Sequence, residues 1–353
     1  MKKSKIFLNR YQIIGGVIMR LYDNEEQQCD IMNDNLVVIE DDITTNTSYL
    51  MSIGTAVTPE NINFMIKYGK GIVYVCISEE TARILKLPYM DRSGGAKGLL
   101  KNSTISIDYK TTTTGISANE RATTIKMLSI SKNSEDFRQP GHIFPLIYKK
   151  KKNDFLKKPN IINAAYTLSQ IVTSLKNTET TPVLCQILNK HGNIASPSEV
   201  RRLSFKHNLT TLTISEIIEL HIKHLEWLKV TDYATIQIQN ETIDVYKMDN
   251  FLYNTQICVY VNTETKELKN FSFHKECLWG DILYISDKCD CCHHLKEHLG
   301  YLINGQVDCV VYQRYTANEK FVSINCENII NRQIKQLIQQ KLEANLQKSS
   351  LIV

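Results

Sequence analysis

The chain has 353 residues and a formal net charge of +5, with 42% hydrophobic and 22% charged residues. These values are ordinary for a globular protein in solution, and the length allows two domains with a core each. Much of the small positive excess comes from Lys149–Lys152, a run typical of a solvated loop, so we expect no nucleic-acid partner.

The N-terminal residues predict neither a signal peptide nor a membrane anchor. Their apolar run is short and is broken by Asn9, Arg10 and Gln12. Without a secretory signal, we expect the ten cysteines to be reduced thiols of a cytoplasmic protein. One group is dense enough to suggest a metal site and consists of Cys277, Cys289, Cys291 and Cys292.

Strand and helix patterns alternate through most of the chain. Apolar runs predict strands at 35–40 and 71–77. Thr58 and Pro59 predict a helix start, because the hydroxyl can cap free amides and proline suits the first turn. Further strands are expected at 104–108, 183–188 and 210–214, and further helices after Ser78 and at 117–128, 164–175, 196–206 and 215–224. This order predicts one mixed α/β domain.

The pattern changes near Lys229. Polar and apolar residues alternate over 234–246 and 251–262, which predicts antiparallel strands joined near 249–250, and 328–346 reads as a closing helix. We therefore expect an α+β or mixed α/β protein. Its predicted parts are an N-terminal extension (1–29), a first domain (30–228) and a smaller, partly antiparallel α+β domain (229–353).

Small and hydroxylated residues are concentrated between Ile105 and Leu146. The turn Thr111–Gly115, with Ser117 after it, could bind an anion at a helix N-terminus or could simply cap that helix. His142 follows Gly141 in the same stretch and is either a ligand or a buried histidine held by backbone hydrogen bonds.

Four blocks of the first domain resemble 3,4-dihydroxy-2-butanone 4-phosphate synthase of riboflavin biosynthesis. They read AVTPENINFMIKYGKGI, IVYVCISEETARILKLPYM, ISIDYKTTTTGISANERATTI and PGHIFPL. In the second domain, HKECLWGD followed by CDC resembles the GTP cyclohydrolase II module that is often fused behind the synthase. The likeness covers roughly residues 30 to 325.

The resemblance implies a lyase that converts ribulose 5-phosphate to formate and a four-carbon phosphate, with magnesium and as a homodimer. No membrane partner is implied. Such chemistry needs oxygen ligands for a hard cation, a general base such as glutamate, and an arginine fork for the phosphate.

The first domain departs from the family pattern at its acidic signature. The family's Arg-Glu-Asn-Glu-Gly-Asp falls on Thr44–Tyr49, so Thr45 replaces a metal-binding glutamate. A neutral hydroxyl is a poorer magnesium ligand than a carboxylate. The acids just upstream, Glu40, Asp41 and Asp42, could substitute if the loop shifts, or could form an ordinary acidic loop tip.

Other positions that the resemblance assigns to the site are kept or altered. His142 matches a metal-binding and catalytic histidine and Cys76 a cysteine at the site, although a buried thiol in a strand is more often a packing residue. Asn163 replaces a catalytic glutamate and cannot act as a base. The substrate-binding positions are Thr114, Ser117, Arg138 (displaced by one residue, with Gln139 in its place), Pro140, Gly141, His142 and Ile143.

In the second domain the resemblance implies zinc held by Cys277, Cys289 and Cys291. Cys292, His293 or His294 could complete the site, and a reduced cysteine cluster is the alternative. Ser272 stands where the family has a GTP-contacting arginine, and the sequence ends at Val353 before the later catalytic residues of a complete module. We expect a truncated domain without GTP cyclohydrolase activity.

Three functions remain open from the sequence. The first domain could catalyse the family reaction or a modified lyase reaction on a sugar phosphate. The protein could instead be a non-catalytic paralogue, a pseudoenzyme that regulates or scaffolds a synthase, or an enzyme repurposed for specialised metabolism. A carboxylate of the 40–42 acids directed at His142 would favour the first function.

Overall fold

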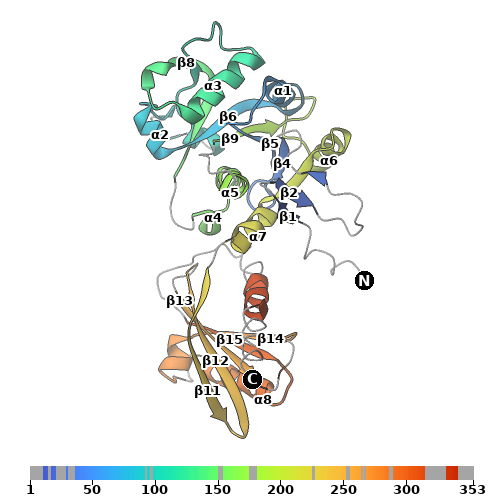
Figure 1. Ribbon diagram of the computed structural model, residues 1–353, viewed down its shortest axis with the longest axis vertical. Coiled ribbons are helices and arrows are strands. Elements are labelled where there is room, and N and C mark those ends of the chain that lie inside the picture. The colour runs from blue at the N-terminus through green and yellow to red at the C-terminus, as the bar shows by residue number, and fades with distance from the viewer. Residues whose placement is uncertain are drawn as a thin grey trace. The chain divides into compact units, whose positions relative to one another are not determined.

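A computed structural model describes residues 11–14, 17–20, 29–30, 36–91, 94–95, 98–149, 154–174, 181–224, 227–251, 255–263, 265, 268–285, 289–314 and 331–340. The chain forms two compact units, Met1–His221 and Ile222–Val353 (Figure 1). The domain boundary predicted after residue 228 lies a few residues after the boundary between these units, at the start of strand β11 (Leu228–Ile238). The predicted extension 1–29 lies largely outside the described residues, which there include the strands β1 (Tyr11–Ile14), β2 (Val17–Arg20) and β3 (Cys29–Asp30).

The first unit is built on a seven-stranded mixed sheet in the order β10-β4-β5-β9-β6-β8-β7. Its strands are β4 (Val37–Glu40), β5 (Ser48–Ile53), β6 (Lys70–Ser78), β7 (Ile107–Tyr109), β8 (Phe137–Tyr148), β9 (Pro182–Ile187) and β10 (Thr210–Thr213). Two pairs are parallel, β10 with β4 and β6 with β8. The predicted mixed α/β class is confirmed.

The described α-helices between residues 59 and 224 are α1 (Pro59–Phe64), α2 (Glu79–Ile84), α3 (Ala118–Ile130), α4 (Asp154–Lys157), α5 (Ile161–Ser174), α6 (Pro197–Lys206) and α7 (Ile214–His224). Four of them, α1, α2, α3 and α6, begin directly after a predicted capping residue. Helix α5 begins before the predicted start at residue 164, and α4 was not predicted. Thr58 and Ser196 form capping boxes, and Ser78 and Ser117 accept hydrogen bonds from the third residue after them.

Apolar side chains of α1, α2, α3 and α6 share one core with the facing side of the sheet. Helix α5 covers strand β8, where the rings of Tyr148 and Tyr166 stack with centroids 4.0 Å apart. Side chains alternate between faces along a strand. Val75 and Ile77 of β6 belong to the core with α3, so Cys76 points to the other face.

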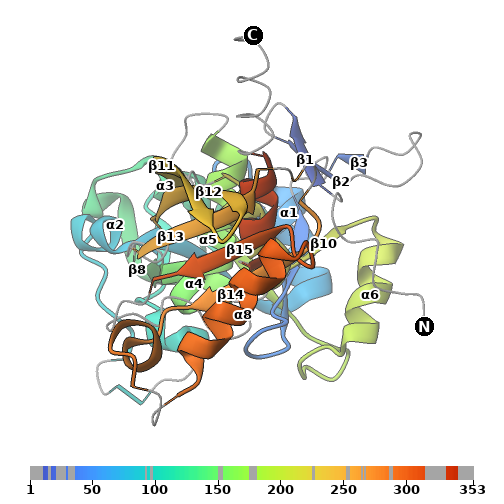
Figure 2. The same cartoon turned by 90° about the horizontal axis from the view of Figure 1, so that it is seen from below.

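The second unit is a five-stranded sheet in the order β11-β12-β13-β15-β14 with a helix beside it. Its further elements are β12 (Glu241–Asn250), β13 (Thr255–Asn262), β14 (Phe271–Lys275), α8 (Cys291–Ile303) and β15 (Cys309–Gln313). Helix α8 runs alongside β14 and β15 (Figure 2), and Leu302 packs into a core with Ile243 and Val310.

One prediction of a strand was wrong, and several strands were not predicted. The stretch 234–246 is not one strand but the hairpin of β11 and β12, which turns at residues 239–240, where Gln239 takes a positive φ of 56°. The polar residues of the turn fit the polar and apolar alternation of the strands on either side, so the turn was not recognised from the sequence. Strands β5 and β8 were not predicted, because β5 is buried along its whole length and β8 contains prolines.

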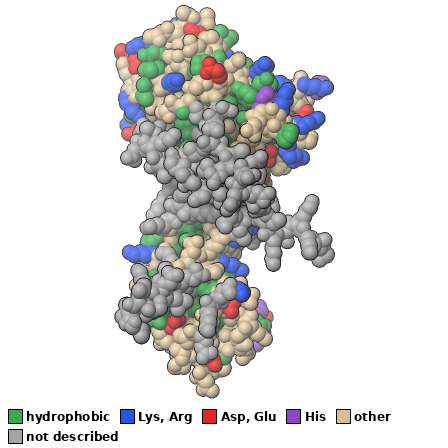
Figure 3. Space-filling view, turned by 45° about the vertical axis from the view of Figure 1, so that its right-hand side comes forward, with side chains coloured by type: hydrophobic (Ala, Val, Ile, Leu, Met, Phe, Trp, Pro, Cys, Tyr) green, Lys and Arg blue, Asp and Glu red, His purple; other side chains and the backbone are tan. Residues whose placement is uncertain are grey.

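Within the part of the chain that is described, no helix is long and apolar enough to cross a bilayer. Apolar side chains nevertheless reach the surface of both units (Figure 3). Of the closing helix predicted over 328–346, residues 331–340 are helical and the rest lies outside the described residues.

Candidate functional site

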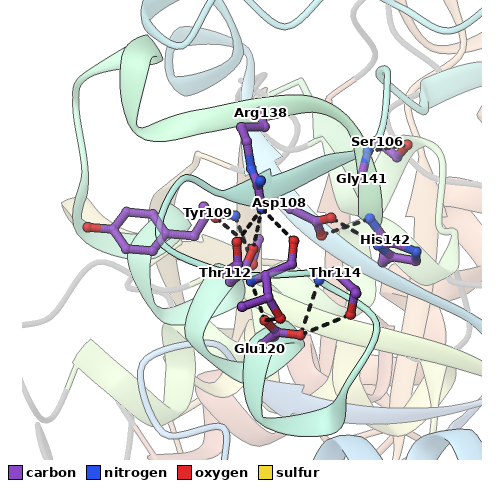
Figure 4. Close-up of polar contacts among 12 residues, drawn as sticks. Ser106, Asp108, Tyr109, Thr112, Thr114, Glu120, Arg138, Gly141 and His142 are labelled. Carbon is purple, nitrogen blue, oxygen red and sulfur yellow. Dashed lines mark hydrogen bonds and ion pairs between the residues drawn. The ribbon is translucent and has the colours of Figure 1, made fainter.

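The Thr-rich turn connects β7 to α3 and gathers donors around one carboxylate (Figure 4). Glu120, in the first turn of α3, accepts hydrogen bonds from the Thr113 amide and from the Thr113 hydroxyl at 2.8 Å. Its other oxygen accepts from the Gly115 amide at 3.1 Å, the Ser117 hydroxyl at 3.2 Å and the Thr114 hydroxyl at 3.4 Å. The donors of the turn therefore converge on a single anionic group.

These hydrogen bonds stabilise the ionised form of Glu120. The hydroxyl and amide of Thr113, followed by Ser117 and Gly115, lower the pKa of the carboxyl to about 2. Thr114 and Ser117, both predicted to bind substrate, are thus engaged with Glu120. The donors of the turn thus hold the chain's own Glu120 carboxylate, and Ser117 also caps α3. Binding of an external anion by this turn stays a prediction.

His142 lies on β8 and is held by Asp108 of β7. Asp108 Oδ1 accepts the His142 backbone N–H at 2.9 Å, and Oδ2 lies 2.9 Å from Nδ1 of the ring. Asp108 is buried, whereas the His142 side chain is 37% exposed. A carboxylate at Nδ1 fixes the ring orientation and favours the tautomer whose Nε2 can accept a bond from a ligand.

Two glycines allow this arrangement. A Cβ at Gly115, which has a positive φ of 78°, would overlap the Asp108 carboxylate, and a Cβ at Gly141 would overlap the backbone of Ile107 and Asp108. The Gly141 amide donates to the buried Ser106 hydroxyl at 3.1 Å. The turn and the histidine strand therefore meet at Asp108.

Arg138 is exposed on β8 and is directed at the turn. Its Nη2 donates to the Thr112 hydroxyl at 2.9 Å and to the Thr113 carbonyl at 3.3 Å. The guanidinium thus fixes the shape of the turn. Of the neighbouring positions predicted to bind substrate, Pro140 is exposed at the surface, and the Ile143 side chain is fully buried in the core.

Cys76 and Asn163 are both buried. Burial raises the pKa of the Cys76 thiol to about 12, so the packing alternative describes this residue better than a reactive thiol. Asn163, near the start of α5, donates from Nδ2 to the Lys158 carbonyl at 3.3 Å, and its backbone amide donates to Asn160 Oδ1 at 3.0 Å. Its amide therefore stabilises a helix start.

The acidic loop between β4 and β5 is closed on itself. Buried Asp41 accepts from the Thr44 amide and the Thr45 hydroxyl, both at 2.7 Å. Burial raises the pKa of Asp41, but the hydrogen bonds from Thr44 and Thr45 outweigh burial and leave the pKa below its usual value. Asp42 accepts from the Ser215 amide at 3.2 Å, at the start of α7. The carboxylate in contact with His142 is therefore Asp108 and not Glu40, Asp41 or Asp42.

The residues expected to hold magnesium are poorly suited to a hard cation. Thr45 donates its hydroxyl to Asp41 and lies 2.6 Å from the Thr47 hydroxyl, and His142 offers only a ring nitrogen. Neither brings negative charge to offset the desolvation of Mg²⁺. Magnesium at this site stays a prediction.

The second unit brings three thiols together. The ligand atoms of Cys277, Cys289 and Cys291 all lie within 4.8 Å of one another, and the Cys277 and Cys289 sulfurs are 3.4 Å apart. Four-coordinate zinc with bonds of about 2.3 Å holds its sulfurs roughly 3.8 Å apart, so these thiols fit zinc and leave a fourth position. Cys292 and the neighbouring histidines are not part of this group among the described residues.

Local geometry favours ionisation of one of these thiols. The Gly280 amide, the Cys289 thiol and the Trp279 amide lower the pKa of Cys277, whereas the Cys289 contact raises the pKa of Cys291 to about 12. A Cβ at Gly280 would lie 2.8 Å from Cys289 Sγ and 2.9 Å from Cys291 Cβ, so the close turn requires glycine.

Two site residues were not predicted from the sequence, Asp108 and Glu120. Asp108 is the last residue of the strand predicted at 104–108 and lies beside Gly115 in the structure, but only the pairing of β7 with β8 shows that it faces His142. Glu120 lies three residues after Ser117, which is the spacing of a capping box and could have identified it.

Comparisons with known proteins agree with this organisation. The family model of 3,4-dihydroxy-2-butanone 4-phosphate synthase matches residues 25–220. The riboflavin biosynthesis protein RibBA of Bacillus velezensis (strain DSM 23117 / BGSC 10A6 / LMG 26770 / FZB42) is 30% identical over 288 residues, which are 79% of this chain and 69% of the relative. RibBA of Staphylococcus haemolyticus (strain JCSC1435) is 29% identical over 283 residues, with the same two shares.

A crystal structure of RibBX, a two-domain 3,4-dihydroxy-2-butanone 4-phosphate synthase from A. baumannii, shares the fold with a TM-score of 0.56 and 24% identity, covering 88% of this chain and 86% of that one. The RibBA alignments are longer than the first unit, so they extend into the second. The predicted fusion of a synthase domain with a GTP cyclohydrolase II-like domain is thus confirmed. The chain belongs to the 3,4-dihydroxy-2-butanone 4-phosphate synthase family.

Proposed function

We propose that the first unit binds a sugar phosphate such as ribulose 5-phosphate but does not carry out the family's unaltered lyase reaction. One observation carries this proposal. Thr45 and Asn163 stand where the family has carboxylates, and their side chains form hydrogen bonds within the protein: Thr45 donates to Asp41, and Asn163 donates to the Lys158 carbonyl before α5. Neither a hydroxyl nor an amide can take a proton from carbon at neutral pH.

The retained residues support binding. His142, oriented by Asp108, presents Nε2 to a sugar oxygen, and the amides of Thr113 and Gly115 can receive a phosphate when Glu120 moves away. Arg138 stabilises the turn by donating to the Thr112 hydroxyl. These contacts bind and orient a substrate, whereas a base for enolisation is not supplied by Thr45 or Asn163.

The deciding experiment uses purified full-length protein with ribulose 5-phosphate and Mg²⁺. We expect binding by calorimetry and no release of formate. Formate at the rate of an active RibBA assayed in parallel would overturn the proposal. The double variant Thr45→Glu/Asn163→Glu tests whether carboxylates alone restore formate release, and Asn160→Asp is a control that adds a carboxylate beside Asn163.

We further propose that Cys277, Cys289 and Cys291 bind zinc, because their sulfurs already lie within reach of one ion. Bound zinc would hold the turn after β14 to the start of α8 and would act as a Lewis acid at its open position. Ser272 at the position of a GTP-contacting arginine argues against GTP hydrolysis. Metal analysis of protein purified without chelators, with Cys289→Ser as the comparison, should give one zinc per wild-type chain and much less in the variant.

A homodimer, the assembly implied by the family resemblance, is also part of this proposal. Light scattering behind size-exclusion chromatography should give twice the mass of 40.6 kDa for the full chain. A monomer at micromolar concentration would contradict it.

A further inference from the structure

We propose that Asp281 is the positioning residue of the cysteine site, holding Cys277 in place so that the three thiols can bind one soft or borderline divalent cation such as Zn²⁺. This inference rests on the metal site proposed above and concerns a residue that does not touch the ion.

Asp281 ties the ligand-bearing turn to the sheet through one oxygen. Its Oδ2 accepts the backbone N–H of Cys277 at 2.8 Å and lies 2.8 Å from Nε2 of His274, on strand β14. The Asp281 amide in turn donates to the Cys277 carbonyl at 2.9 Å. Cys277 is therefore fixed on both sides of its peptide backbone by the same residue.

The pair is buried, which makes its geometry restrictive. The side chains of His274 and Asp281 are only 6% and 2% exposed. Among the described residues, the second oxygen of Asp281 has no hydrogen-bond partner. A buried carboxylate cannot exchange its partners for water without a large cost, so the two contacts it makes hold Cys277 and His274 firmly.

The histidine is itself held by its neighbours. The His274 ring stacks on Tyr312 of β15, with centroids 5.7 Å apart and planes at 12°, and meets the edge of His298 of α8 at 5.6 Å. Asp281 thus connects the Cys277 turn to a packed cluster that joins β14, β15 and α8. Cys289 lies just before α8 and Cys291 is its first residue. The cluster therefore connects the turn that carries Cys277 to the helix that carries the other thiols.

Groups that orient metal ligands without touching the ion typically change metal affinity by 10- to 100-fold when they are removed. Asp281→Ala leaves the Cys277 amide and His274 without their acceptor. Asp281→Asn keeps an oxygen in place but removes the charge, which weakens both bonds. The expected order of metal affinity is therefore wild type, then Asp281→Asn, then Asp281→Ala.

A matched control separates positioning from general stability. Asp308 also accepts two backbone N–H groups, from Lys269 at 2.9 Å and Asn270 at 2.7 Å, and neither of these contacts involves the described residues of the cysteine turn. Asp308→Ala should lower the thermal midpoint of the full-length protein and leave its metal affinity unchanged.

The experiment measures Zn²⁺ affinity by competition with a chromophoric chelator and the thiolate-to-cobalt charge-transfer absorption of the Co²⁺ form. We expect Asp281→Ala to bind Zn²⁺ about 10- to 100-fold more weakly than wild type and to lose cobalt–thiolate absorption. The Zn²⁺ affinity of Asp281→Asn should lie between those of Asp281→Ala and Asp308→Ala. Equal affinity and absorption in Asp281→Asn and Asp308→Ala would overturn the role of Asp281, even if Asp281→Ala does not fold. Wild-type protein that binds neither ion would instead overturn the metal site itself.

Discussion

Asp108 holds His142 with both carboxylate oxygens: Oδ1 accepts the backbone N–H and Oδ2 lies 2.9 Å from the ring Nδ1. We expect Asp108→Asn to destabilise the protein by about 1–3 kcal/mol, because an amide nitrogen replaces one buried acceptor. The same change should weaken binding of ribulose 5-phosphate. Urea unfolding and calorimetry measure the two effects, with exposed Glu135→Gln as a control that should change neither.

Gly115 and Gly192 form a matched pair for testing how tightly the site is packed. Both have positive φ, 78° and 79°, but a Cβ at Gly192 would meet nothing within 4 Å, whereas one at Gly115 would overlap Asp108. Gly192→Ala should cost about 1–2 kcal/mol from backbone strain alone. Gly115→Ala should cost about 1–3 kcal/mol more, from overpacking, as measured by urea unfolding. Equal losses in the two variants would show that the turn relaxes away from Asp108.

Glu120 makes the stability of the first unit depend on pH in the acid range. Its folded-state pKa of about 2 lies below the ordinary 4.5, so its contribution is fully present above pH 4.5 and is lost as the pH falls toward 2. The difference in unfolding free energy between wild type and Glu120→Gln should therefore shrink as the pH falls through this range. A difference that stays constant from pH 5 to pH 2 would contradict the hydrogen bonds of the turn.

Bound phosphate and the Glu120 carboxylate should compete for the amides of the Thr-rich turn. A phosphate that binds the Thr113 and Gly115 amides must displace the Glu120 carboxylate, because both use the same donors. Glu120→Gln should therefore bind inorganic phosphate more tightly than wild type at neutral pH, as followed by amide chemical shifts of the turn. Weaker binding in the variant would place the phosphate elsewhere.

The cysteines of the folded protein should differ in their rates of alkylation. The pKa of about 12 leaves Cys76 with roughly a thousandfold less thiolate than an ordinary thiol of pKa 9.0, and burial blocks access. In metal-free protein, Cys277 should react first, since hydrogen bonds lower its pKa. Peptide mapping by mass spectrometry after a brief alkylation checks the order, and added Zn²⁺ should protect Cys277. Rapid labelling of Cys76 in the folded protein would contradict its packing role.

The helix starts at Thr58, Ser78, Ser117 and Ser196 were predicted correctly from the sequence. Each depends on a side chain that bonds an amide a few positions later, so neighbouring residues contain the information. The order of strand and helix patterns was likewise sufficient to predict the mixed fold, and the close spacing of the cysteines was sufficient to predict the cysteine group.

Contacts between distant segments decided what the sequence left open. His142 meets Asp108, 34 positions away, and Arg138 meets Thr112, 26 positions away, only because β7 pairs with β8. The sequence by itself determined the helix starts, the family and the replacement of carboxylates at positions 45 and 163. Tertiary structure alone decided which carboxylate faces the histidine, because the pairing of strands far apart in sequence depends on the packing of the whole core and not on local residue preferences.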